Sequence, residues 1–476
     1  GSMSEDCLNL NVFAPANTPI GAAGNKLLPV MVWIYGGAYV EGSADADLYD
    51  AAPFANHTDT VVVTFNYRIG ALGFLVDHNL GIEGNYGIYD QIHALQWVQN
   101  NIQAFGGDPN RVTIFGQSAG AMSVGIHLLL DESAPLFHRA IMESNPFGIP
   151  YKNIPEATAD ASSFISKIGC GSSIFDEKSL DNSINGKHLK ANRMLDADST
   201  MSCIKDKTYQ EILTAQAQAR HLSLKFFTEF LTWVPVINSK LIPYDPVIAY
   251  IGNHNVQKKP ILMGTNTNEG IMFVYSAWQH ELYSVEYDAA VVGLFGLSSY
   301  SKIKNLYPSI SGDNRPVLSQ IVTDYLFTCA SRKVAASVSK NFGPDYPIYF
   351  YHFNHVMSFN PWGPNYTFCG GEVCHGEEII YIFDVAMNNG FHFTTNEKQL
   401  SCSMMNYWSS FSHSTSGDPN SDPAFPCPNG PLLKWPTYNG KANNNMLFET
   451  PKNSIQNDLL LKKCAFWDQW DYNFQG

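Results

Sequence analysis

The stretch Val112-Thr113-Ile114-Phe115-Gly116-Gln117-Ser118-Ala119-Gly120 decides the fold of this chain. Its first four residues are apolar or β-branched and predict a buried strand, while the apolar run from Ala121 to Leu130 predicts a helix that leaves the turn. Residues 116–120 match the pattern Gly-x-Ser-x-Gly, whose glycines permit a strained turn that raises the serine oxygen above the sheet. We therefore interpret Ser118 as a nucleophile, in preference to an ordinary turn that happens to contain a serine.

Strand and helix patterns alternate around this turn. Pro29 to Tyr35 and Val61 to Asn66 are short apolar runs, typical of buried strands in a largely parallel sheet. Tyr89 to Phe105 carries apolar residues at helical spacing, and strand patterns return at residues 260–264 and 348–353. This order predicts the α/β class. The more polar residues from about 155 to 225 predict a helical insertion over the sheet, and we expect residues 1–476 to form one domain.

The composition argues against several classes of partner. The chain has 43 acidic and 29 basic residues and a formal net charge of −14, so it offers no basic surface for nucleic acid or an anionic membrane. The longest apolar stretch, Leu27 to Tyr35, contains Pro29 and is far shorter than the ~20 residues of a membrane-spanning helix. We expect neither a nucleic-acid partner nor a membrane span.

The cysteines favour disulfides over a metal site, because they lack the paired spacing of zinc ligands. They are Cys7, Cys170, Cys203, Cys329, Cys369, Cys374, Cys402, Cys427 and Cys464. Their odd number leaves at least one thiol unpaired.

Glycosylation sequons begin at Asn56 and Asn365, and together with the cysteines they predict a secreted protein or one of the secretory-pathway lumen. Gly1-Ser2-Met3 resembles a cloning remnant, and we expect that a natural signal peptide was removed.

A second half of the candidate site lies upstream, in Trp33-Ile34-Tyr35-Gly36-Gly37-Ala38-Tyr39. The N–H groups of Gly37 and Ala38, with that of Ala119, could bind the oxyanion of a tetrahedral intermediate. A glycine pair after a strand is usually only a structural turn. Its place before the serine turn favours the functional interpretation.

Motifs spread over nearly the whole chain occur together. They are Ser4-Glu5-Asp6-Cys7-Leu8-Asn9-Leu10-Asn11, Val32 to Gly37, Asn66-Tyr67-Arg68, Gly84-Asn85 through Asp90-Gln91, Phe105 to Pro109, Phe115 to Gly120 and Cys464-Ala465-Phe466-Trp467. With them the chain resembles the type-B carboxylesterase and cholinesterase family. The resemblance implies an α/β-hydrolase fold, with helices flanking a mostly parallel sheet, and a serine esterase that needs no metal or organic cofactor.

The resemblance also implies the other members of a catalytic triad. The family acid corresponds to Glu269 in Gly264-Thr265-Asn266-Thr267-Asn268-Glu269-Gly270, and the base to His375 in Cys374-His375-Gly376-Glu377-Glu378-Ile379. The chain order nucleophile, acid, histidine is that of α/β-hydrolases. We expect His375 to accept the proton of Ser118, and Glu269 to orient the imidazole ring.

Family positions suggest further pairs and pocket residues. The expected disulfides are Cys170–Cys203, Cys329–Cys464 and Cys369–Cys374, which leave Cys402 and Cys427 as candidates for a fourth. The expected substrate pocket includes Gln117, Leu231 and Phe273. The short Cys369–Cys374 spacing is more similar to protist and bacterial esterases, such as the slime-mould crystal-protein type, than to animal cholinesterases.

Departures from the family favour neutral esters of short to medium acyl chains. Gln117 is neutral where cholinesterases have glutamate, and Glu377 replaces their tyrosine, whereas a quaternary ammonium needs aromatic faces and nearby negative charge. The family segment before Ser4, which carries the choline-binding tryptophan and the usual partner of Cys7, is missing. Two alternatives remain: an adhesion or storage protein of weak or no activity, and a cholinesterase-like enzyme. The sequence does not specify the oligomeric state.

Overall fold

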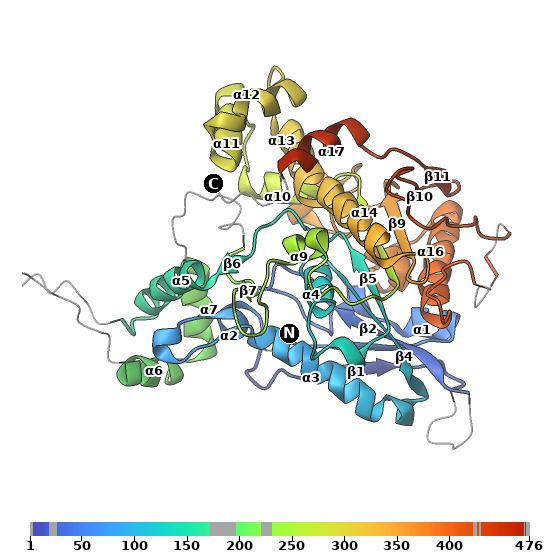
Figure 1. Ribbon diagram of the computed structural model, residues 1–476, viewed down its shortest axis with the longest axis horizontal. Helices are drawn as coiled ribbons and strands as arrows, with labels where there is room; N and C mark the ends of the chain where they lie inside the picture. The colour runs from blue at the N-terminus through green and yellow to red at the C-terminus, as the bar shows by residue number, and fades with distance from the viewer. Residues whose placement is uncertain are drawn as a thin grey trace, which may run out of the picture.

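One mixed β-sheet runs through the protein (Figure 1). The computed structural model describes residues 3–18, 26–171, 197–219, 231–421, 426–427, 430–470 and 472. Within these residues the nine strands of the sheet lie in the order β1 (Leu10–Phe13), β3 (Val61–Phe65), β2 (Leu28–Ile34), β4 (Gly107–Gln117), β5 (Arg139–Glu143), β8 (Ile261–Asn266), β9 (Ile348–Phe353), β10 (Asn445–Phe448) and β11 (Ser454–Gln456). The edge strands β1 and β11 are antiparallel to their neighbours, and all the other pairs are parallel. The predicted mostly parallel sheet is confirmed.

The central strands are apolar along their whole length because both faces of the sheet are covered. Every residue of β3 is buried, and so is every residue of β2 after Leu28. Trp33 of β2 packs against the rings of Phe115 and Phe383, with centroid distances of 4.8 and 5.1 Å. These strands form the middle of the hydrophobic core.

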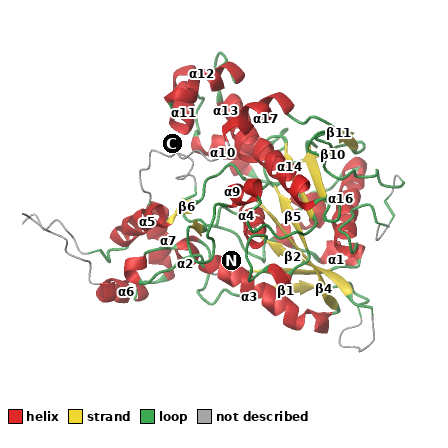
Figure 2. Ribbon diagram, in the orientation of Figure 1, coloured by secondary structure: helices red, strands yellow, loops and turns green. Residues whose placement is uncertain are grey.

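Helices cover the two faces of the sheet (Figure 2). The α-helices are α1 (Ala52–Thr58), α2 (Gly70–Phe74), α3 (Tyr86–Asn101), α4 (Ala119–His127), α5 (Ile154–Lys167), α6 (Ala197–Lys205), α7 (Tyr209–Gln218), α9 (Pro246–Gly252), α10 (Glu269–Ala277), α11 (Ser284–Phe295), α12 (Leu297–Leu306), α13 (Arg315–Val322), α14 (Ala330–Phe342), α15 (Ile379–Phe383), α16 (Thr395–His413) and α17 (Leu461–Trp467). Thr113 of β4 donates a hydrogen bond to Ser412 of α16, whereas Gly116 lies against α4. Because side chains alternate along a strand, α16 and α4 lie on opposite faces.

The predicted insertion is helical where the structure describes it. Helices α5, α6 and α7 lie away from α16 and the C-terminal strands in Figure 1. Capping boxes begin α5, at Asn153 and Glu156, and α7, at Thr208 and Glu211. Residues 172–196 and 220–225 of the predicted segment lie outside the described residues. The single-domain organisation remains an expectation.

The described chain contains four disulfides. They are Cys170–Cys203, Cys329–Cys464, Cys369–Cys374 and Cys402–Cys427, the pairs named from the sequence. Cys7 is free. Disulfides are compatible with the secretory pathway. Among the described helices, none combines the length and the apolar character that crossing a membrane requires.

Candidate active site

Ser118 occupies a strained turn between β4 and α4. Its φ of 58° and ψ of −123° place a residue with a side chain in a region that favours glycine. The turn presses against β2: a Cβ atom on Gly116 would lie 2.6 Å from the carbonyl oxygen of Ile34, and one on Gly120 would overlap the same oxygen. The two glycines of the motif are therefore required by this close approach.

Glu269 and His375 form a buried hydrogen-bonded pair. The imidazole Nδ1 lies 2.5 Å from Glu269 Oε2, and Glu269 Oε1 accepts a hydrogen bond from the backbone N–H of Asn266 at 2.7 Å. Glu269 is fully buried and His375 is 6% exposed. The carboxylate fixes the ring orientation and requires the proton on Nδ1, as a triad base needs.

Hydrogen bonds join the loop that precedes Glu269 to the loop that carries His375. The N–H of Asn268 donates to the carbonyl of Val373 at 3.0 Å, and the N–H of Val373 donates to Asn268 Oδ1 at 3.1 Å. The side chain of Asn266 donates to the carbonyl of Cys374 at 2.9 Å. These contacts hold the loop after β8 against the loop that bears His375.

The link between the base and Ser118 is not formed in this structure. No hydrogen bond within the described residues joins Ser118 Oγ to His375. Instead His375 Nε2 lies 3.1 Å from the side-chain amide nitrogen of Gln117. The structure thus brings all three predicted triad residues to one region, where Gln117 contacts His375.

The predicted oxyanion-binding groups lie in two turns. Gly37 and Ala38 have φ values of 106° and 55°, and Ala119 is the first residue of α4. Within the described hydrogen bonds, the N–H groups of these three residues have no acceptor. They are therefore free to donate to a substrate oxygen.

Two further carboxyl groups are fully buried behind the triad. Glu378 accepts hydrogen bonds from Asn266 Nδ2 at 2.5 Å and from the Ser144 hydroxyl at 3.2 Å. Glu143 Oε1 accepts the indole N–H of Trp408 at 2.7 Å. Burial, and then the neighbouring Glu378, raises the pKa of Glu143 well above its usual value. Burial, and then Glu269, raises the pKa of Glu378.

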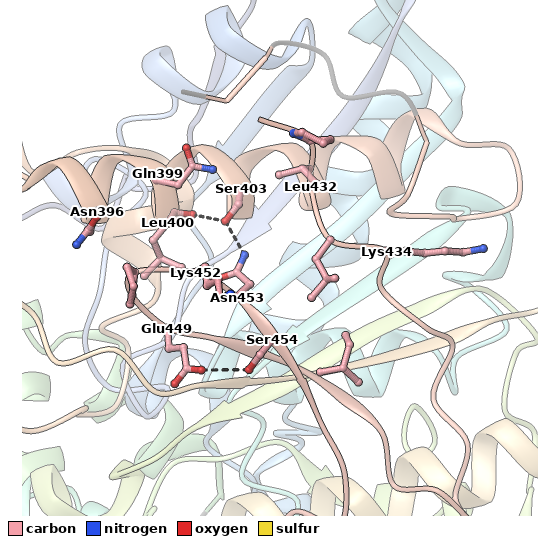
Figure 3. A pocket seen from close by; sticks show the side chains of 14 residues that line it. Asn396, Gln399, Leu400, Ser403, Leu432, Lys434, Glu449, Lys452, Asn453 and Ser454 are labelled. Atoms are coloured by element: carbon pink, nitrogen blue, oxygen red, sulfur yellow. Dashed lines mark hydrogen bonds between the residues drawn. The ribbon is translucent and has the colours of Figure 1, made fainter. Parts of the chain in front are cut away.

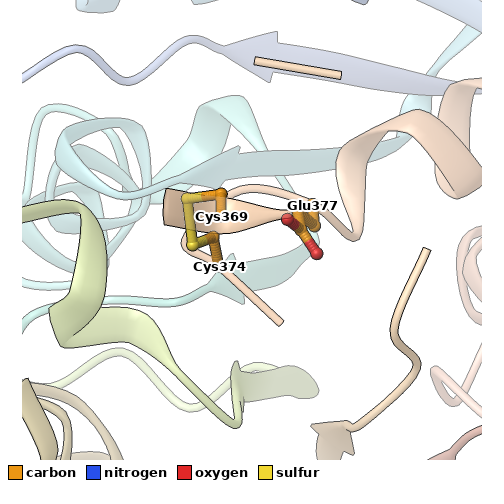
Figure 4. A group of neighbouring side chains, drawn as sticks. All are labelled: Cys369, Cys374 and Glu377. Atoms are coloured by element: carbon orange, nitrogen blue, oxygen red, sulfur yellow. A yellow bond between two sulfur atoms is a disulfide. The ribbon is translucent and has the colours of Figure 1, made fainter. Parts of the chain in front are cut away.

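Glu377 lies beside the Cys369–Cys374 disulfide (Figure 4). Its side chain is 1% exposed, and desolvation raises its pKa to about 9, so the carboxyl group is neutral at pH 7. Donor atoms of these three residues lie close enough to surround an ion. The two sulfurs are bonded to each other, however, and a disulfide lacks the thiolates that bind zinc.

Aromatic side chains surround the base. Phe273, a predicted pocket residue one turn after Glu269, has its ring centroid 5.0 Å from that of His375. Phe327, which the sequence interpretation missed, lies 5.1 Å from it. Trp362, also missed, lies against Gly376, where a Cβ atom would be 3.3 Å from its indole ring. No motif marks these two positions. Leu231 is buried in the main core, and its place in the pocket remains a prediction.

A separate surface hollow of about 660 Å³ lies between α16, the loop at residues 431–434 and the segment that leads from Glu449 into β11 (Figure 3). Ser403, Asn453 and Glu449 are among the residues that line it. Asn453 donates to Ser403 at 3.0 Å, and Ser454 donates to Glu449 at 3.1 Å. No residue of the candidate triad lines this hollow.

Both predicted glycosylation residues, Asn56 and Asn365, are exposed on the surface.

Comparisons with known proteins agree with this arrangement. A protein-family model described as "Carboxylesterase family" matches residues 1–467. The "Crystal protein" of Dictyostelium discoideum is 35% identical over 99% of this chain and 78% of its own length. An "Acetylcholinesterase" of Bungarus fasciatus is 31% identical over 98% of this chain and 72% of its own. The solved structure of a "PNB ESTERASE" has a TM-score of 0.74 and 28% identity, and the match covers 99% of this chain and 85% of that one.

Proposed function

This chain belongs to the carboxylesterase family, and we propose that it hydrolyses carboxylic esters through an acyl-enzyme formed on Ser118. That it is a carboxylic ester hydrolase follows from the family and from its structural neighbours. The roles of individual residues are the proposal. The observation that carries it is the buried pair of His375 and Glu269, beside a serine in a strained turn.

The proposed mechanism has two halves. In the first, the oxygen of Ser118 attacks the ester carbonyl as its proton moves to His375 Nε2. The tetrahedral intermediate collapses, the alcohol leaves with that proton, and the acyl group stays on Ser118. In the second, water gives a proton to His375 and attacks the acyl carbonyl; the bond to Ser118 then breaks, His375 returns the proton to the serine oxygen, and the carboxylic acid leaves. Glu269 stabilises the imidazolium in both halves.

The oxyanion of each intermediate is proposed to bind the N–H groups of Gly37, Ala38 and Ala119. Loss of one such donor typically costs about 3 kcal/mol of transition-state stabilisation. Among the described residues, no other acceptor binds these N–H groups, which supports this role.

The proposed substrates are neutral esters of short to medium acyl chains. Gln117 brings no charge to the base, and the neutral, buried Glu377 does not offer a carboxylate to a cationic head group. A buried cation is stabilised best where an anion accompanies aromatic faces in place of its hydration shell. Phe273, Phe327 and Trp362 offer aromatic surface without such an anion, which favours an uncharged ester.

A secretory location is proposed as well. Four disulfides and two exposed sequon asparagines support it. Treatment of the natural protein with an N-glycosidase should lower its mass, and Asn56→Gln and Asn365→Gln should each remove part of that change. An unchanged mass would contradict glycosylation at both sites.

Covalent labelling tests the nucleophile directly. A neutral organophosphate should add one group per chain and abolish ester hydrolysis, and peptide mass mapping should locate the group on Ser118. The Ser118→Ala variant should remain unlabelled, whereas Ser123→Ala, one turn along α4, should label normally. Labelling at another serine, or hydrolysis that survives in Ser118→Ala, would overturn the proposal.

A further inference from the structure

The contact between Gln117 and His375 has a defined direction. Because Nδ1 of the neutral ring carries the proton that Glu269 accepts, Nε2 presents a lone pair. A primary amide nitrogen only donates, so the Gln117 amide donates to that lone pair across 3.1 Å. This is the lone pair that must accept the proton of Ser118.

Backbone geometry fixes where Gln117 reaches. Gln117 ends β4 opposite Glu143 of β5, and its side chain is 5% exposed. A Cβ atom on Gly36 would lie 3.2 Å from the amide oxygen, and one on Gly376 would lie 3.5 Å from the amide nitrogen. The missing Cβ of Gly36 therefore leaves room for the amide oxygen, whereas a Cβ at Gly376 would make only an ordinary van der Waals contact with the amide nitrogen.

The ring does not need Gln117 to hold its orientation. Glu269 binds Nδ1, and the rings of Phe273 and Phe327 pack near the imidazole. The hydrogen bond from the Gln117 amide is therefore not needed to fix the orientation of the ring. Its chemical effect is to occupy the one acceptor position of the base.

We propose that the Gln117 amide occupies the Nε2 lone pair of His375 in the resting enzyme, and that substrate binding releases it so that Ser118 can take its place. The inference rests on the proposed function, because it assigns His375 as the base for Ser118. The hydrogen bond from Gln117 makes the free enzyme less reactive than an enzyme in which the amide is withdrawn from His375. The release step is then part of the acylation barrier.

Two variants separate this role from simple packing. Gln117→Met keeps the approximate size without a donor, and it should raise both kcat/KM for a neutral ester and the rate of organophosphate reaction by about fivefold, the effect of one neutral hydrogen bond. Gln117→Glu keeps the shape but places an anion beside the ring. That charge favours the imidazolium, so the acid limb of the pH–rate profile should move up by about one pH unit.

Gln210→Glu is the matched control for charge, because it makes the same change on the exposed surface of α7. Its pH–rate profile should match that of the wild type. If Gln117→Met does not fold, Gln117→Asn withdraws the amide by one methylene and takes its place. Thermal unfolding identifies a variant with damaged folding.

A spectroscopic readout keeps the test independent of turnover. In protein with ¹⁵N-labelled histidine, the Nε2 resonance of His375, assigned with His375→Gln, should move in Gln117→Met and stay in Gln210→Glu. An unmoved resonance, or a lower kcat/KM in Gln117→Met, would overturn the inference. If the wild type neither turns over esters nor labels at Ser118, the proposed function fails, while the resonance still decides the contact.

Discussion

The backbone N–H of Ser118 donates to the carbonyl oxygen of Glu143 at 2.9 Å, which anchors the turn that carries Ser118 to a strand residue whose own carboxyl group is fully buried. Glu143 Oε2 has no hydrogen-bond partner within the described chain. Glu378 lies near enough to raise the pKa of Glu143 further. A carboxylate here would have little to stabilise its charge.

Glu143→Gln should therefore become stabilising relative to the wild type as the pH rises. The raised pKa means that folded Glu143 keeps its proton at pH values where the unfolded side chain, near its ordinary value, has lost it. Unfolding then releases a proton, so this group's contribution to stability falls as the pH rises above about 4.5. Glutamine cannot ionise, so the variant does not lose this stability at high pH. Denaturant unfolding midpoints of the variant and the wild type at pH 5 and pH 8 measure the difference in stability, with the exposed Glu132→Gln as control. The same difference from the wild type at both pH values would contradict the prediction.

Glu269→Gln should keep the fold and lower kcat by about four orders of magnitude, because a neutral amide cannot stabilise the imidazolium and can select the wrong tautomer. Glu377→Gln should have a far smaller effect, since the buried carboxyl group is already neutral at pH 7. Steady-state kinetics of the two variants at pH 7 provide the comparison. Equal losses at both positions would show that the acid has been assigned wrongly.

Removing two disulfides should separate stability from activity. Cys329 and Cys464 are 135 residues apart, and Cys369 and Cys374 only five. Chain entropy alone then gives about 5 kcal/mol of stabilisation for the long loop and about 2 kcal/mol for the short one. Paired serine substitutions should therefore lower the free energy of unfolding more at the first site. At the second, adjacent to His375, they should lower kcat more. Denaturant unfolding measures the two stability losses, and initial rates measure the two losses of kcat. A larger stability loss at Cys369–Cys374, or a larger loss of kcat at Cys329–Cys464, would contradict the prediction.

Neutral esters should be hydrolysed with higher kcat/KM than choline esters. Each pair of substrates should share the acyl group and the pKa of the leaving group, so that only head-group recognition differs. A preference for the choline member would show that Phe273, Phe327 and Trp362 act as a cation-binding wall. Trp362→Leu would then be the first variant to measure, with Phe273→Leu beside it.

Five of the nine strands in the sheet, β2, β3, β4, β8 and β9, could be predicted from the sequence, because each contains a continuous apolar run. The strands β1, β5, β10 and β11 were missed, because they are short and each includes a polar or charged residue. The predicted strand at residues 348–353 matches β9 at both ends. Boundaries that depend on tertiary contacts were less accurate. Helix α3 begins at Tyr86, three residues before the prediction, after Asn85 in the left-handed conformation. The side chain of Asn85 bonds to Val236, and no local pattern marks that distant contact.

In the candidate site too, residues within local motifs could be predicted and contacts between distant residues could not. Ser118, Glu269 and His375 lie in motifs with local signatures, so sequence alone could propose them. The contact of Gln117 with His375 joins residues 258 positions apart, and that of Glu143 with Trp408 joins residues 265 apart. Such pairs depend on the order of strands in the sheet and on which helix covers each face. One sequence without its fold does not specify them.

The spacing of these contacts also bears on how the enzyme assembles. Glu269 and His375 are 106 residues apart. Ser118 follows β4 and His375 follows β9, and β5 and β8 lie between these two strands in the sheet. Contacts between distant positions require closure of long loops and form slowly, whereas helices form within microseconds. In refolding from denaturant with the disulfides intact, helical circular dichroism should therefore return before esterase activity. Recovered turnover would report that strands from β4 to β9 have reached their native order.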